Sequence, residues 1–189
     1  MHKTVFSQVA QASRLFLLAV IAALVGSANA IAADRAALER DAHSAYQKLI
    51  TRVSGAKALS RDAVAVLVFP KITKAGLVVG GQYGDGVLFR GGQAAGYYNT
   101  AGASYGLQAG AQQFGYAMFF MNEKSLNALN QNDGFEVGVG PSVVVVDQGM
   151  GKSLTTTTAK DDIYAFIFSQ KGLMAGIGLQ GNKITRLAD

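Results

Sequence analysis

The sequence predicts an α+β domain: a glycine-rich, strongly coiled antiparallel sheet or partly closed barrel, with an N-terminal helix and one short helix. Three observations predict this class. Apolar residues recur at helical spacing over residues 33–54, and short β-branched and aromatic runs follow from residue 64 onward. Of the 23 glycines, 21 fall in the last 114 residues, interleaved with those runs.

Residues 1–30 have the pattern of a secretory signal peptide. Lys3 and Arg14 supply positive charge, residues 15–25 form an uncharged apolar run, and a small-residue cleavage pattern ends at Ala30. The apolar run is too short to span about 30 Å of hydrocarbon, which takes roughly 20 residues. We therefore expect an exported chain, periplasmic or extracellular, whose residues 31–189 form a single domain.

The predicted long helix spans residues 33–54 and ends at Gly55. Its apolar positions share one stripe at 3.6-residue spacing: Leu38, Ala42, Ala45, Leu49 and Val53. The basic residues scatter over the polar side and are interrupted by Glu39 and Asp41. We expect the stripe to pack against the sheet. The alternative is a helix on a membrane surface, although such helices usually carry a continuous basic face.

Apolar runs bounded by glycine or polar residues predict the strands, at residues 64–69, 84–90, 96–99, 105–112, 116–121, 135–139, 142–147, 163–169, 173–179 and 183–187. The first strand is expected to stop at Pro70. Residues 80–86 are expected to form a turn with Asp85 and Gly86 at its tip. A short helix is expected over residues 122–130.

The glycines recur at even separations. Gly76, Gly80 and Gly84 are four residues apart, and so are Gly102, Gly106 and Gly110. Because successive strand residues point to opposite faces, such glycines share one face of a sheet. A face without side chains lets another backbone approach closely, or lets the sheet coil tightly.

No cofactor, metal site or catalytic centre is predicted. The chain has no cysteine, and after residue 30 its single histidine is His43, so the usual zinc ligand sets cannot be assembled. A hydrolase would have to use His43, and no G-x-S-x-G motif accompanies it. Residues 80–86 lack the Lys-Ser/Thr pair of a phosphate loop. An enzyme is therefore not expected.

Positive charge is concentrated near the start of the predicted domain. Residues 31–74 carry eight Lys or Arg against four acidic residues, whereas residues 75–189 carry seven against eight. This asymmetry indicates an anionic partner. Lys71 and Lys74 follow the first strand and adjoin an uncharged run, which suits a lipid head group held beside the acyl boundary. With Arg52, Lys57 and Arg61 just upstream, they are the predicted lipid-binding residues; the alternative is that all five are solvated surface charges.

These segments resemble the SYLF domain, a lipid-binding family. The resemblance rests on residues 65–76, 79–88, 106–112, 138–141, 162–166 and 171–176, which follow the family's order and cover about residues 33–187. It implies an α+β fold, phospholipid binding (in eukaryotic members especially to phosphoinositides) and no known catalysis. One position departs from the family pattern: this chain has Tyr97, Tyr98 and Asn99 where a Trp-Ser pair is common.

The leading hypothesis is therefore non-enzymatic binding of anionic phospholipid head groups at a membrane surface in the cell envelope, with peripheral membrane association and no nucleic-acid partner. The actin and SH3-partner roles of eukaryotic family members are not expected for an exported protein. The alternative is a structural envelope protein, a glycine-rich β-barrel or self-assembling sheet, with no specific ligand.

Overall fold

A computed structural model of the chain describes residues 33–76, 79–105, 110–131, 134–146, 160–172, 179 and 181–188. The chain divides into two compact units, Met1–Ala37 and Leu38–Asp189. The predicted signal peptide, residues 1–30, lies outside the described residues, as does nearly all of the predicted strand 173–179. Within the described part, no helix is long and apolar enough to cross a membrane.

The long helix is present, but it does not end at Gly55. Residues 33–52 are helical, the backbone becomes extended at Val53 (φ −116°, ψ 109°), and α2 continues from Ser54 to Asp62. Helical hydrogen bonding crosses the junction, since the Lys57 N–H donates to the Val53 carbonyl at 3.0 Å. Gly55 is buried inside α2. The predicted helix end is therefore wrong, and α2 is a helix that the sequence argument did not predict.

The short helix predicted over residues 122–130 is confirmed as α3, Glu123–Leu129. Asn122 caps it, because its side-chain oxygen accepts a hydrogen bond from the Ser125 N–H at 2.8 Å. Leu126 and Leu129 lie on the buried side of α3.

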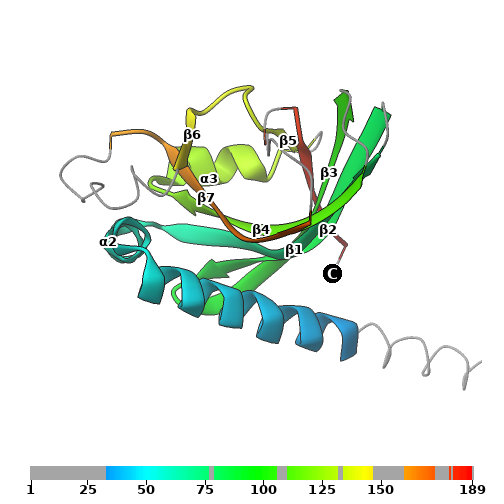
Figure 1. Cartoon of the computed structure of the whole chain (residues 1–189). Helices are drawn as coiled ribbons and strands as arrows, with labels where there is room; N and C mark the ends of the chain where they lie inside the picture. The colour runs from blue at the N-terminus through cyan, green and yellow to red at the C-terminus, as the bar shows by residue number, and fades with distance from the viewer. Residues whose placement is uncertain are drawn as a thin grey trace, which may run out of the picture. The chain divides into compact units, whose positions relative to one another are not determined.

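One eight-stranded sheet forms the body of this unit. Its strands are β1 Ala65–Gly76, β2 Val79–Arg90, β3 Gln93–Tyr105, β4 Gly110–Phe120, β5 Phe135–Glu136, β6 Val143–Val146, β7 Ile163–Gly172 and β8 Lys183–Arg186. They lie in the order β5-β8-β3-β2-β1-β4-β7-β6, and all neighbours are antiparallel except β6 and β7. The sheet curls strongly around α3 (Figure 1). The predicted fold class is confirmed, with one parallel pair added.

β1 does not stop at Pro70 but runs through it to Gly76. The pairing of β1 with β4 changes register between Phe69 and Ile72, which marks a β-bulge. Proline has no N–H to donate to a ladder, so it is tolerated where a bulge interrupts the pairing. The predicted strand end at Pro70 is wrong for this reason.

Asp85 and Gly86 lie inside β2 and not at the tip of a turn. The β2–β3 hairpin turns instead at Gly91 and Gly92, whose φ angles are +58° and +80°. These angles fall in the left-handed region that glycine adopts without strain. The predicted turn is wrong because the glycines of β2 serve packing and not chain reversal.

The glycines of β2 make room for side chains of β1. A Cβ added to Gly84 would lie 2.5 Å from Ile72 Cδ1, and one added to Gly86 would lie 2.6 Å from the ring of Phe69. Both distances are too short for real atoms, so the large side chains of β1 lie across the bare positions of β2. A Cβ at Gly84 would also lie 2.5 Å from the Lys71 carbonyl oxygen, and one at Gly76 would lie 2.3 Å from Gly80 Cα. The close backbone approach expected at these glycines is therefore confirmed.

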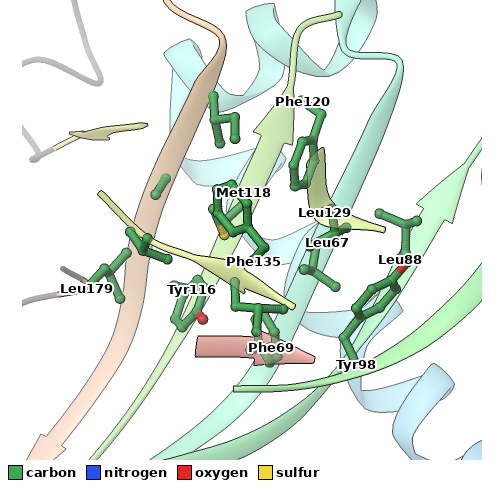
Figure 2. Close-up of a cluster of buried hydrophobic side chains, with 14 of the residues drawn as sticks. Leu67, Phe69, Leu88, Tyr98, Tyr116, Met118, Phe120, Leu129, Phe135 and Leu179 are labelled. Carbon is green, nitrogen blue, oxygen red and sulfur yellow. The ribbon is translucent and has the colours of Figure 1, made fainter. Parts of the chain in front are cut away.

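The concave face of the sheet holds one hydrophobic core. Alternate residues of β1 and β4 point into it: Leu67, Phe69, Tyr116, Met118 and Phe120. Figure 2 shows Leu129 of α3 and Phe135 of β5 among them. This core is closed by α3 and the short end strands.

The convex face packs against the N-terminal helix and α2. Its side chains are those that alternate with the first core: Val66, Val68, Val87, Phe89, Ala117, Phe119, Tyr164 and Phe166. Ala42 and Leu49 of the helix are 0% and 4% exposed against them. The prediction that the apolar stripe packs on the sheet is confirmed, and the alternative in which that stripe faces a membrane is excluded.

Candidate functional site

The five cations predicted to bind lipid occupy separate places in the fold. Arg52 ends the N-terminal helix, Lys57 and Arg61 lie on α2, and all three are exposed. Lys71 is exposed on β1, and Lys74 on the same strand is only 5% exposed. Because a strand rises about 3.3 Å per residue, Lys71 lies about 20 Å along β1 from the end that follows α2. The structure therefore does not bring the five into one surface patch.

Exposed cations lie in two pairs on the helices, and one of them, Lys48, was not among the predicted lipid-binding residues. Lys48 and Arg52 are four residues apart on one helix, and Lys57 and Arg61 are four apart on the next, so each pair shares a helix face. All four are exposed, and none forms an ion pair within the described residues. We call these four the helical cations. The four-residue spacing within each pair is visible in the sequence.

The helical cations are unfavourable for the helices that carry them. Like charges four residues apart destabilise a helix by about 0.2–0.5 kcal/mol per pair. An anionic partner would remove this repulsion.

Beyond the helices, the convex face of the sheet is uncovered where β1 to β4 approach their glycine-rich ends. The side chains there are mostly small and exposed: Thr73, Ala75, Ala101, Ala103 and Ala111. Two larger ones stand among them, Val79 at 60% and Tyr83 at 58% exposure. The charge of Asp85 raises the pKa of the Tyr83 phenol, so this hydroxyl stays neutral. The exposed surface around Val79 and Tyr83 is therefore largely apolar, with the Asp85 carboxylate beside the tyrosine.

On the opposite, concave face of the same strand ends, three long polar side chains lie side by side. Lys74 of β1 pairs in register with Gln82 of β2 and with Gln112 of β4. Their exposed fractions are 5%, 7% and 4%. We call these three residues the polar rung. The prediction that Lys74 lies on the surface is wrong, because its orientation is set by the bulge at Pro70 and by strand pairing, which a single sequence does not display.

Asn182, which precedes β8, completes this group. Its Oδ1 accepts a hydrogen bond from Gln82 Nε2, and the residue is 2% exposed. Gly102 of β3 admits it, because a Cβ at Gly102 would lie 2.0 Å from Asn182 Oδ1. Among the described residues, two buried polar side-chain atoms have no hydrogen-bond partner, and both belong here: Gln112 Oε1 and Asn182 Nδ2.

Deeper in the concave face, the polar groups are paired. The Tyr116 hydroxyl donates to Thr100 Oγ1 at 2.9 Å, and both residues are fully buried. Burial raises the pKa of Tyr116, and the hydrogen bond to Thr100 opposes this only in part. This pair therefore stays neutral and closes the hydrophobic core beneath the polar rung.

Two cavities lie away from the rung. One, of about 710 Å³, is lined by α3, Pro141 and Asp162. The other, of about 480 Å³, lies between the N-terminal helix and the β2–β3 hairpin and is lined in part by His43 and Phe89. The two rings meet edge to face, 6.2 Å between centroids. In the described part of the chain, His43 hydrogen-bonds to no serine or carboxylate, so the geometry that a hydrolase needs is not assembled there.

Comparison with known proteins agrees with the resemblance drawn from the sequence. Residues 101–189 match the sequence model of a family described as Ysc84, Las17-binding protein actin regulator, which is the SYLF family. That family is associated with lipid binding and actin regulation. The matched residues include Gln112 and Asn182 but none of the helical cations. No curated protein matches the chain.

Proposed function

Since the C-terminal part of this chain matches the SYLF family, we propose that the protein binds anionic phospholipid head groups at a membrane surface and catalyses no reaction. One observation carries the proposal: the helical cations are four exposed Lys and Arg side chains with no ion pair in the described residues. Each basic residue near an anionic membrane contributes about 1 kcal/mol of attraction. The signal-peptide pattern of residues 1–30 supports a location in the cell envelope.

The uncovered convex face supports the same proposal. Val79 and Tyr83 are exposed on the same side of the sheet that carries the helices. A peripheral protein gains affinity when apolar side chains enter the boundary between head groups and acyl chains while cations contact the head groups. A tyrosine suits this boundary, because its ring is apolar and its hydroxyl can hydrogen-bond to water.

Vesicle sedimentation tests the proposal. The full chain is mixed with phosphatidylcholine vesicles with or without phosphatidylglycerol. The variant changes all four helical cations: Lys48→Gln, Arg52→Gln, Lys57→Gln and Arg61→Gln. We expect its affinity for the anionic vesicles to fall by about tenfold or more at low ionic strength, and added salt to erase the difference through screening.

The matched control removes two exposed cations elsewhere, Lys160→Gln and Lys183→Gln, and should bind nearly as the wild type does. Circular dichroism verifies that each variant is folded. Equal binding of the wild type to neutral and anionic vesicles would reject the proposal, as would undiminished binding by the folded fourfold variant.

A further inference from the structure

The cavity of about 480 Å³ between the N-terminal helix and the β2–β3 hairpin is lined by side chains of both charges. Its volume lies in the usual range of about 300–1,000 Å³ for small-molecule sites. The helix contributes Glu39, Arg40 and His43, and the hairpin contributes Gln93. His43 is four residues from Glu39 and three from Arg40, so its side chain neighbours both on the helix surface. One wall of the cavity therefore presents a carboxylate, a guanidinium and an imidazole together.

The polar groups that line this cavity are available to a ligand. Arg40, His43 and Gln93 form no hydrogen bond or ion pair within the described residues. Glu39 Oε1 accepts a hydrogen bond from the Tyr97 hydroxyl, and its second carboxylate oxygen accepts none from the described part of the chain. The two oxygens of a carboxylate offer about four acceptor positions. Both charges are therefore open to a bound group.

Part of the lining is apolar. Phe89 lines the cavity, and its ring meets the imidazole of His43 edge to face. Gly92 and Ala94 line the hairpin side, where the absence of a large side chain keeps the cavity open. The cavity thus offers an apolar surface directly beside its charged groups, which suits a short carbon chain.

The mixture of charges selects the chemistry of the ligand. A guanidinium donates bidentately to phosphate oxygens, and His43 and Gln93 add N–H donors. Glu39 opposes a ligand that is only anionic, but its carboxylate accepts hydrogen bonds from an ammonium group. Side chains three or four positions apart on a helix have Cβ atoms about 5–6 Å apart, a separation that a two-carbon chain between an ammonium and a phosphate spans.

We propose that this cavity binds a phosphoethanolamine group, with the phosphate at Arg40 and His43 and the ammonium at Glu39. The group occurs free and as the head group of phosphatidylethanolamine. The site adds a zwitterionic ligand to the anionic lipids proposed above. None of the helical cations lines the cavity, so the site does not rest on the proposed membrane attachment, and the two are separable by mutation.

Calorimetry and nuclear magnetic resonance of the full chain test the site. Phosphoethanolamine, short-chain phosphatidylethanolamine, glycerol 3-phosphate and ethanolamine are titrated separately into ¹⁵N-labelled wild-type protein. Either phosphoethanolamine compound should shift the signals of the Gln93 side-chain amide and the Arg40 Nε–H saturably, and the compound that binds more tightly identifies the source of the group. Glycerol 3-phosphate lacks the ammonium and ethanolamine lacks the phosphate, so each should bind about tenfold more weakly or less.

Substitutions that remove one charge at a time identify which end of the ligand each residue binds. Arg40→Gln should weaken phosphoethanolamine binding by about tenfold or more, and so should Glu39→Gln, which retains an acceptor for the Tyr97 hydroxyl. After Glu39→Gln, phosphoethanolamine should bind no better than glycerol 3-phosphate. Asp41→Asn and Lys48→Gln change exposed charges on the same helix outside the cavity and should leave binding unchanged.

The wild-type titration decides the matter even if a variant does not fold. The site would be rejected if neither phosphoethanolamine compound bound saturably. Equal affinity for phosphoethanolamine and glycerol 3-phosphate would show that no ammonium is recognised and would overturn the assignment, as would undiminished binding by folded Arg40→Gln and Glu39→Gln. The fourfold variant of the helical cations should retain phosphoethanolamine binding even where vesicle sedimentation is lost; loss of both would mean that the cavity is not a separate site.

Discussion

Asp162 shows how a single carboxylate at the start of a strand joins three segments. Its Oδ1 accepts a hydrogen bond from Asn122 Nδ2 at 2.8 Å, and its Oδ2 accepts from the Ser142 N–H at 3.3 Å. Asn122 is also the cap of α3, and Ser142 directly precedes β6. The structural role of Asp162 follows from contacts between segments that are distant in the sequence.

The hydrogen bond from Asn122 lowers the pKa of the Asp162 carboxyl, so the native state favours the ionised form. The resulting stability is present above the unfolded-state pKa of about 3.9 and is lost as the pH falls through the lower native value. Between pH 5 and about pH 3, we expect the melting temperature of Asp162→Asn to fall by less than that of the wild type. The difference should be small, because the carboxylate is largely solvated.

Thermal melts followed by circular dichroism across that pH range measure this effect. Asp62→Asn, at an exposed position on α2, is the matched control and should follow the wild type. Identical pH dependence of the wild type and Asp162→Asn would show that the hydrogen bonds at Asp162 do not favour the ionised carboxylate.

At the scale of single residues, sequence patterns predicted some orientations and missed others. Leu49 was correctly assigned to the buried side of the helix, because helical spacing depends only on neighbours in the chain. Lys74 was not recognised as buried, because its orientation depends on the bulge after Phe69. Nothing in the sequence near Gln112 or Asn182 indicates that these side chains are buried, because their burial depends on strand pairing.

Among the elements, β2 shows how a glycine makes room for close packing against the neighbouring strand. Gly86→Ala would place a Cβ 2.6 Å from the ring of Phe69 and 2.8 Å from the Val68 carbonyl oxygen. The backbone atom cannot move aside without disturbing β1. We therefore expect the free energy of unfolding to fall by about 1–3 kcal/mol, the usual range for overpacking.

Gly81→Ala is the matched control on the same strand, because its nearest described neighbour would be 3.9 Å away. Urea denaturation of the two variants gives the comparison, and Gly81→Ala should stay close to the wild type. Equal destabilisation by both substitutions would mean that strand propensity, and not close packing on the concave face, accounts for the loss.

The element boundaries that the sequence argument missed have a common physical origin. Pro70 and the glycines at residues 84 and 86 are residues that ordinarily end strands, and here they lie within β1 and β2. A bulge accommodates the proline, and the side chains of β1 fill the space over the glycines. Local propensity was overridden by contacts between strands, which a single sequence does not display.

For the whole described unit, the two hydrophobic cores share the same strands. Leu67 and Val68 are neighbours on β1, yet one belongs to the concave core and the other to the convex core. Met118 and Phe119 divide in the same way on β4. Loss of either core would expose one face of both strands, so neither core is expected to persist without the other.

This arrangement predicts one cooperative unfolding transition for the helices and the sheet together. Leu49→Ala removes packing from the convex core, and Leu126→Ala removes it from the concave core. Each should lower the free energy of unfolding by about 2–5 kcal/mol and shift a single midpoint. Far-ultraviolet circular dichroism, which follows the helices, and the near-ultraviolet signal of the buried Tyr98 and Tyr116 should shift together. If Leu49→Ala melted the helical signal first and left the tyrosine signal in place, the convex layer would be an independent unit and the shared-strand argument would fail.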